Sequence, residues 1–317
     1  MPSVFKSSRT VPPDHPAFAT LPIELITMRD ARTRIAVHRR GQFGDGRMPL
    51  VCVAGYNRNM SDFTGLAGYL PRIGQGDWPL VLIDLGGRGR SDDRAKGSDY
   101  GSLADAHDLA DTLMALGIGK AIILGQGHGG QVAMALAAEH PLLVGGTILL
   151  DAGPVTDSRS IVRLRNNLAH IHGLRGGKTV SAGFNKILAG TYPGLPENLL
   201  PPLALRSHWF DKRGRARPLF DNKLIERLKD FSFDDVLTPQ WPLFDALTCA
   251  PLLLLRTQLT DQVRRETFEE MVRRRPDAVA LTIMGQGSPA LFDEMEDVEA
   301  VTRFMVEASA KQAELAA

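Results

Sequence analysis

Hydrophobic residues follow two alternating patterns along this chain. Short, nearly continuous apolar runs occupy residues 49–55, 79–84, 120–125, 147–151, 251–256 and 279–284. Runs of this kind are typical of strands that are covered on both faces of a sheet. Longer segments with helical spacing occupy residues 103–116, 129–139 and 293–314. The alternation predicts an α/β fold in which helices connect and cover a mostly parallel sheet.

Two further features complete the predicted organisation. Residues 23–27 and 34–40 flank a turn-like segment and are expected to pair as an antiparallel hairpin, which brings the sheet to eight strands. Between residues 154 and 245 the alternation gives way to Arg-rich and Pro-rich stretches, which indicate a helical insertion. The predicted units are an N-terminal tail (1–20), a core (21–153 and 246–317) and a cap-like insertion (154–245).

Composition and charge exclude several classes of partner. The 317 residues hold 37 Lys and Arg against 36 Asp and Glu, so a net charge of +1 argues against binding to nucleic acid or to an anionic membrane surface. Two cysteines cannot build a disulfide framework, which favours a reducing compartment. No apolar run resembles a signal peptide or a membrane span. We therefore expect a cytoplasmic protein whose partner is a small molecule.

Four short segments follow the predicted strands in a characteristic order. Gly-Tyr-Asn-Arg-Asn at 55–59 follows the third strand, and Asp-Leu-Gly-Gly-Arg-Gly-Arg-Ser-Asp at 84–92 follows the fourth. Gly-Gln-Gly-His-Gly-Gly at 125–130 joins the fifth strand to a helix, and Asp261 lies just past the seventh. This chain resembles the α/β-hydrolase fold family from about Leu21 to its end. The resemblance implies that the insertion occupies the position of the family's cap.

The nucleophile position departs from the family pattern. In this family the turn between the fifth strand and its helix reads G-x-S-x-G, and it exposes the serine hydroxyl at the carboxyl edge of the sheet. The corresponding residue in this chain is Gly127. Because glycine has no side chain, the covalent route that the family uses has no attacking atom here.

The general base is missing as well. The resemblance places it after the eighth strand, where this chain reads Gly285-Gln286-Gly287-Ser288-Pro289, so Gly287 or Ser288 stands in its place. The last histidine of the whole chain is His208. Asp261 matches the acid that would orient the base, and without a histidine it is expected to be a remnant.

These departures predict a pseudoenzyme that keeps a binding pocket. The resemblance places an oxyanion hole at the backbone N–H groups of Tyr56 and His128. The expected function is non-hydrolytic binding of a small, partly apolar molecule, with no cofactor and no metal. The residues expected to contact it are Tyr56, Asn57, Gln126, Gly127, His128 and Ser288, with Arg58 beside them.

Two alternatives remain open from the sequence. In the first, His128 or a histidine of the insertion acts as the base of an active hydrolase or lyase. In the second, residues 125–130 also satisfy G-x-G-x-x-G between a strand and a helix, and Asp151 ends the next strand, as in a dinucleotide-binding unit. Replacing an elbow serine by glycine produces that fingerprint automatically.

The insertion contains further candidate residues without a clear motif. His170, His172 and His208 do not match a zinc-binding spacing. Trp209, Trp241 and Phe244 are expected either to form the insertion's own core or to roof an apolar pocket.

Overall fold

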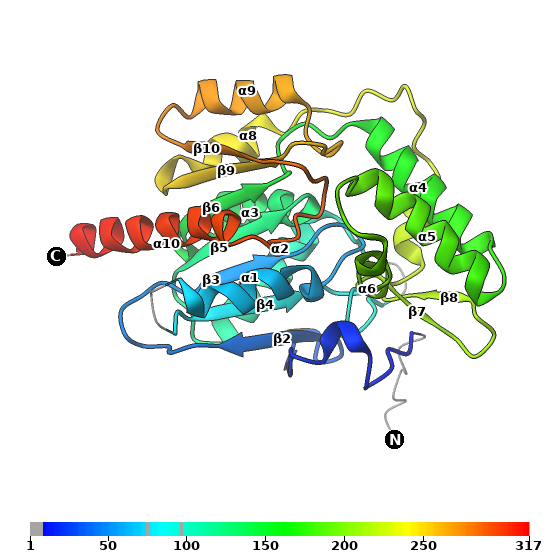
Figure 1. Ribbon diagram of the computed structural model, residues 1–317. Helices are drawn as coiled ribbons and strands as arrows, with labels where there is room; N and C mark the ends of the chain where they lie inside the picture. Colours follow the sequence, from blue (N-terminus) through cyan, green and yellow to red (C-terminus); the bar gives the residue numbers. More distant parts are fainter. Residues whose placement is uncertain (1–8, 74–76, 96–97, 317) are drawn as a thin grey trace.

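An eight-stranded sheet runs through the centre of the molecule (Figure 1). The computed structural model describes residues 9–73, 77–95 and 98–316, so the first eight residues of the predicted N-terminal tail lie outside the described part. Strands β1 and β2 form the expected antiparallel hairpin, β2 pairs antiparallel with β4, and the remaining neighbours are parallel. In spatial order the strands are β1 (Glu24–Thr27), β2 (Arg34–Arg40), β4 (Leu80–Asp84), β3 (Leu50–Val53), β5 (Ala121–Gln126), β6 (Val144–Leu150), β9 (Leu252–Thr257) and β10 (Val279–Ile283). The predicted fold class is confirmed.

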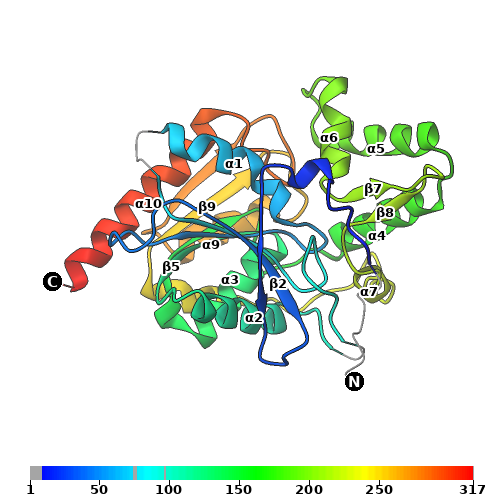
Figure 2. The same ribbon diagram turned by 90° about the horizontal axis from the view of Figure 1, so that it is seen from below.

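Along the central strands, alternate side chains point into two separate hydrophobic cores, one on each face of the sheet. Leu50 and Cys52 of β3 face one core, whereas Val51 and Val53 face the other, as the two-residue period of a strand requires. Helices α1 (Thr64–Tyr69) and α10 (Met295–Ala316) contribute to the first core. Helices α2 (Ser102–Ala115), α3 (His128–Glu139) and α9 (Arg265–Arg274) contribute to the second. Figure 2 shows the helices on both sides of the sheet.

Strand β6 begins three residues before its predicted start. The extra residues, Val144, Gly145 and Gly146, are all buried in the sheet. A Cβ atom on Gly145 would lie 2.2 Å from the Met48 sulfur, so the absence of a side chain allows this close packing. Two glycines interrupt the apolar run in the sequence, which is why the pattern did not reveal the whole strand.

The insertion between β6 and β9 is not wholly helical, which corrects one expectation. Besides its helices it contains an antiparallel pair, β7 (His208–Phe210) and β8 (Ala216–Pro218). The turn between them is closed by Asp211, whose carboxylate accepts the Arg213 and Arg215 N–H groups. The helices of this region are α4 (Ser158–Gly173), α5 (Gly177–Thr191), α6 (Leu200–Leu205), α7 (Lys223–Arg227) and α8 (Trp241–Asp245).

The aromatic residues singled out in the insertion pack on the main cores. Phe244 is fully buried in the core that contains α3, and Trp241 packs against that core. Trp209 packs against the opposite core. They therefore join the insertion to the sheet-and-helix body, and neither of the two expected roles describes them.

Short 3₁₀ helices complete the described structure. They are η1 (Pro16–Phe18), η2 (Met60–Phe63), η3 (Leu70–Arg72), η4 (Pro141–Leu143), η5 (Glu197–Leu199) and η6 (Ala246–Cys249). No helix within the described residues combines the length and the apolar character needed to cross a bilayer.

Candidate functional site

Gly127 forms a sharp turn between β5 and α3. Its backbone has φ +51° and ψ −115°, a conformation that side chains with a Cβ rarely adopt. The neighbouring glycines are needed for close packing, because a Cβ on Gly125 would lie 2.3 Å from the Gly129 carbonyl oxygen. A Cβ on Gly129 would lie 2.2 Å from the Val53 carbonyl oxygen. By contrast, a Cβ on Gly127 would meet only the Gln262 side-chain oxygen, at 3.5 Å. The turn therefore has room for a side chain at position 127 that the sequence does not supply.

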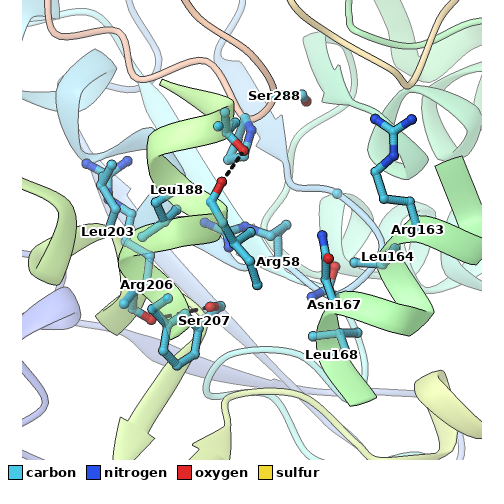
Figure 3. A pocket seen from close by; sticks show the side chains of 18 of the residues that line it. Arg58, Arg163, Leu164, Asn167, Leu168, Leu188, Leu203, Arg206, Ser207 and Ser288 are labelled. Atoms are coloured by element: carbon cyan, nitrogen blue, oxygen red, sulfur yellow. Dashed lines mark hydrogen bonds between the residues drawn. The ribbon is translucent and has the colours of Figure 1, made fainter. Parts of the chain in front are cut away.

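Two cavities adjoin this turn, and Gly127 lines both. Cavity 1 has a volume of about 620 Å³ and lies between the carboxyl ends of the strands and helices α4 to α6 (Figure 3). Cavity 2 has a volume of about 540 Å³ and lies beside the start of α3. Tyr56, Ser160, Leu164 and Gln262 also line both cavities. The turn is thus accessible from two sides.

The structure brings most of the predicted site residues to one cavity. Six of them line cavity 1: Tyr56, Asn57, Gln126, Gly127, Asp261 and Ser288. The seventh, His128, lines cavity 2. Helix α3 starts at His128, so the N–H of this residue is among those that a helix leaves without an intrahelical acceptor. The roles assigned to these residues remain predictions.

Ser288, which stands at the position of the missing base, lies beside the carboxylate of Asp151. Its hydroxyl hydrogen-bonds the side chain of Asp151, the residue that follows β6. Asp151 is fully buried, and its two oxygens accept the Thr257 N–H at 2.7 Å and the Thr257 hydroxyl at 2.8 Å. Burial raises the pKa of Asp151 to about 6, and the hydrogen bonds from Thr257 and Ser288 limit that rise.

These contacts bear on the dinucleotide alternative. In a dinucleotide-binding unit, Asp151 would accept hydrogen bonds from the ribose. Here both of its carboxylate oxygens accept hydrogen bonds from Thr257 of β9. The glycines at 125 and 129 are explained by the backbone approaches at the turn. The fingerprint in this chain is therefore accounted for by packing.

Asp261 is held at the side of cavity 1 by the insertion. Its carboxylate forms an ion pair with Arg163 of α4, at 3.0 Å. About a third of the Asp261 side chain is exposed. Asp261 thus links the loop after β9 to the insertion.

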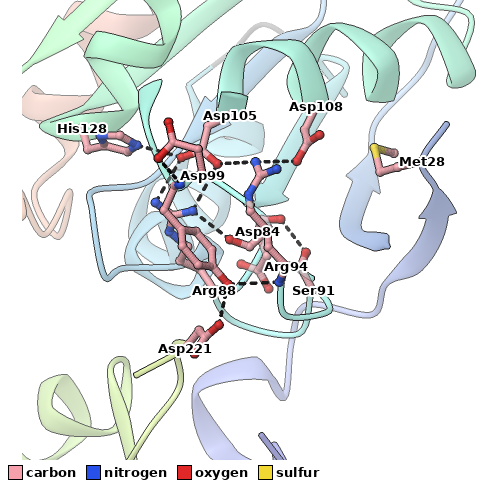
Figure 4. Close-up of polar contacts among 12 residues, drawn as sticks. Met28, Asp84, Arg88, Ser91, Arg94, Asp99, Asp105, Asp108, His128 and Asp221 are labelled. Carbon is pink, nitrogen blue, oxygen red and sulfur yellow. Dashed lines mark hydrogen bonds and ion pairs between the residues drawn. The ribbon is translucent and has the colours of Figure 1, made fainter. Parts of the chain in front are cut away.

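The imidazole of His128 contacts a buried ionic cluster. His128 Nε2 lies 2.8 Å from Asp105 Oδ2 (Figure 4). The imidazole ring also packs edge-to-face with Tyr56. Arg88 and Arg94 form ion pairs with the same carboxylate at 3.1 and 2.7 Å. Burial alone would raise the pKa of Asp105, but Arg88, His128 and Arg94 outweigh it and hold the pKa well below its usual range. Because an ionised carboxylate only accepts hydrogen bonds, Nε2 of His128 carries the proton.

Arg88 joins this cluster to the loop that resembles the family motif. Its guanidinium donates to the carbonyl oxygens of Tyr56 at 2.9 Å and Gly86 at 2.7 Å. Asp84 of the same motif accepts the N–H groups of Met60 and Arg90. The motif therefore fixes the loops beneath the site and does not enter either cavity.

Two histidines of the insertion, His172 and His208, lie against each other, and His208 lines cavity 1. His172 Nε2 lies 3.1 Å from His208 Nε2, and Ser207 Oγ lies 2.9 Å from His208 Nδ1. Burial, followed by His172 and Arg58, lowers the pKa of His208 well below its usual range. His170 lines the same cavity. In the described parts of the chain, no group of three or more His, Cys, Asp or Glu residues is arranged to hold a metal ion.

Three residues of these sites were not predicted from the sequence. Arg88 lies inside the quoted motif, so its position was available but its role was not. Asp105 lies one turn into α2 and carries no local signal for its contact with His128. Arg206 lines cavity 1 and follows α6 in a region without a motif. Only its placement in three dimensions reveals it.

Comparison with known proteins agrees with the fold. Residues 48–190 match the model of the alpha/beta hydrolase fold family. A 3-hydroxybutyrate-oligomer hydrolase of Cupriavidus necator is 25% identical over 86% of this chain and 92% of its own length.

Solved structures give the same result. An alpha/beta hydrolase from Novosphingobium aromaticivorans superposes with a TM-score of 0.76 at 26% identity, over 90% of this chain and 98% of that one. An E-2-(acetamidomethylene)succinate hydrolase superposes with a TM-score of 0.70 at 21% identity, over 90% and 99% of the two chains. Together with the strand order and the turn at Gly127, these matches show that the chain has the α/β-hydrolase fold.

Proposed function

We propose that this protein binds a small, partly apolar molecule in cavity 1 and does not hydrolyse it. The observation that carries the proposal is the open space above Gly127, where the turn of a hydrolase is present without a nucleophile. At the position of the missing base, Ser288 bonds the buried Asp151, and the sequence contains no histidine after His208. A bound ester therefore meets no activated attacking group.

The lining of cavity 1 supports a partly apolar ligand. Five leucines, Leu164, Leu168, Leu188, Leu203 and Leu259, line its walls, while Asn57, Gln126 and Ser288 supply polar groups near the turn. A volume of about 620 Å³ lies within the usual range for small-molecule sites. The relative from Cupriavidus necator is named as a hydrolase of 3-hydroxybutyrate oligomers, which are small molecules of this mixed character.

A direct test is the hydrolysis of p-nitrophenyl butyrate. The wild-type protein is expected to release p-nitrophenol no faster than buffer, whereas the double variant Gly127→Ser, Ser288→His should gain activity. The new serine has space, because only the Gln262 oxygen lies near its Cβ, and its cost is the backbone strain of φ +51°. Wild-type turnover near about 1 s⁻¹, an ordinary enzymatic rate, would contradict the proposal.

The two candidate acids provide a matched control in that double variant. A histidine at position 288 replaces the side chain that contacts Asp151, so Asp151→Asn should remove most of the gained activity. Asp261→Asn should leave it nearly unchanged, because Asp261 is paired with Arg163. Equal losses in both variants would show that Asp261 still serves as the acid.

A second candidate function rests on the contact between His128 and Asp105. The carboxylate fixes Nε2 as the protonated nitrogen, so Nδ1 is the basic atom of a histidine that lines cavity 2. This arrangement suits general acid–base chemistry in cavity 2. Its test is a screen of the wild type and His128→Gln with lactones and epoxides. Activity that depends on His128 supports this candidate, and equal activity of the two proteins rejects it.

A further inference from the structure

Cavity 1 is lined by more positive than negative side chains. Four cations line it, namely Arg58, Arg163, Lys186 and Arg206, against the single carboxylate of Asp261. Two of the arginines have their own acids. Arg58 Nε lies 2.7 Å from the buried Asp62, and Arg163 pairs with Asp261 at 3.0 Å. Lys186 is exposed to solvent.

Arg206 differs from the other cations of the cavity. Its side chain is half-buried, and its Nη1 is a buried atom without a hydrogen-bond partner. Among the described residues, no carboxylate lies within ion-pair distance of Arg206, and the nearby Asp62 is already bonded to Arg58. A buried guanidinium without a counter-charge costs free energy unless another group supplies one.

The side chain of Asn59 holds the main chain of Arg206. Asn59 donates its side-chain N–H to the Arg206 carbonyl oxygen at 2.7 Å. Asn59 in turn caps η2 by accepting the Ser61 N–H. Figure 3 shows Arg206 and Leu203 on one side of the cavity and Arg163 and Leu164 of α4 across it. The main chain of Arg206 is therefore anchored at the wall of the cavity.

We infer that cavity 1 binds a monocarboxylate with an apolar chain, and that Arg206 holds the carboxylate. The inference rests on the proposed function and names the chemical class of its ligand. One half-buried cation without a counter-charge matches one negative charge, and a planar guanidinium pairs with a planar carboxylate through two parallel hydrogen bonds. The neighbouring His208 is neutral and adds no charge. The leucine walls accommodate the apolar chain.

The test is calorimetric titration of the intact protein with octanoate, 1-octanol and octyl phosphate. Octanoate should bind saturably and more tightly than 1-octanol. Arg206→Met should weaken octanoate binding roughly ten- to a hundred-fold, the range for a hydrogen-bonded charged group, and leave 1-octanol binding unchanged. Arg265→Met is the control, because Arg265 is an exposed arginine of α9 that lines neither cavity and already has an acid, Glu269. It should leave octanoate affinity unchanged.

Each other outcome has a defined meaning. Equal octanoate affinity in the wild type and Arg206→Met overturns the inference. Wild-type binding of 1-octanol as tight as that of octanoate also overturns it, while leaving the proposed binding function intact. Tighter binding of octyl phosphate replaces the monocarboxylate with a dianion and overturns the inference. If neither octanoate nor 1-octanol binds, the proposed function fails together with the inference.

Discussion

Arg88 and Arg206 lie near the same turn, but only Arg88 has an acidic partner within the described residues. Arg88 is fully buried, pairs with Asp105 and donates to two carbonyl oxygens. Arg206 has a buried nitrogen with no partner and faces cavity 1. The chain supplies the counter-charge where an arginine supports the fold. At Arg206 the chain supplies no acid, and we infer that a ligand provides the counter-charge.

The largest expected effect comes from removing the counter-charge beneath the turn. Asp105→Asn leaves Arg88 and Arg94 buried with one fewer negative partner. We expect the free energy of unfolding to fall by about 3–5 kcal/mol, measured by urea denaturation. Asp92→Asn is the control, because its pair with Arg34 is largely exposed and is worth about 1 kcal/mol or less. A similar loss of unfolding free energy in both variants would show that the buried cluster around Asp105 stabilises the fold no more than an exposed ion pair does.

The next effect concerns a buried carboxylate that has hydrogen-bond donors but no direct ion pair. Burial raises the pKa of Asp151 to about 6, so the folded state holds its proton more tightly than the unfolded state, whose pKa is near 4. The stability from this proton is complete below the unfolded pKa and is lost as the pH rises through about 6. Asp151→Asn should reduce the loss of stability between pH 4 and pH 8 by up to about 3 kcal/mol.

Unfolding by urea at several pH values measures this difference. Thr257→Val offers a sharper comparison, because it removes the hydroxyl that stabilises the ionised carboxylate. It should move the transition of Asp151 to higher pH. If the unfolding free energy of the wild type and of Asp151→Asn changed with pH in the same way, the loss of stability could not be attributed to Asp151.

The smallest expected effect is an increase in stability, whereas the first prediction is a decrease. Arg206→Met removes a buried nitrogen that has no partner, so it should leave the stability unchanged or increase it by about 1 kcal/mol. Arg58→Met is the matched control from the same cavity, because it leaves Asp62 buried without its cation and should destabilise the protein. Thermal unfolding without ligand compares the two. A marked destabilisation by Arg206→Met would show that its charge supports the fold.

The fold was largely predictable because its main signals are local. Buried strands appear as apolar runs such as residues 80–84, and the turn at Gly127 is marked by the glycines around it. The exceptions have local causes too. Gly145 and Gly146 concealed the start of β6, and the pair β7–β8 lies in a charged segment without a run of apolar residues.

The candidate site was predicted only in part. Residues next to the strand ends, such as Tyr56 and Ser288, could be placed because sheet topology brings those ends together. The partner of Ser288 and the cluster around His128 depend on contacts between distant segments. The unpaired state of Arg206 is equally hidden, because a sequence does not show which charges find partners.

The central claim is that cavity 1 binds a small, partly apolar molecule and does not hydrolyse it. A single NMR experiment tests both parts by following ethyl octanoate in the presence of the protein over several hours, with saturation transfer reporting binding. We expect a saturable transfer signal and an unchanged ester spectrum. The appearance of ethanol and octanoate faster than in buffer would contradict it.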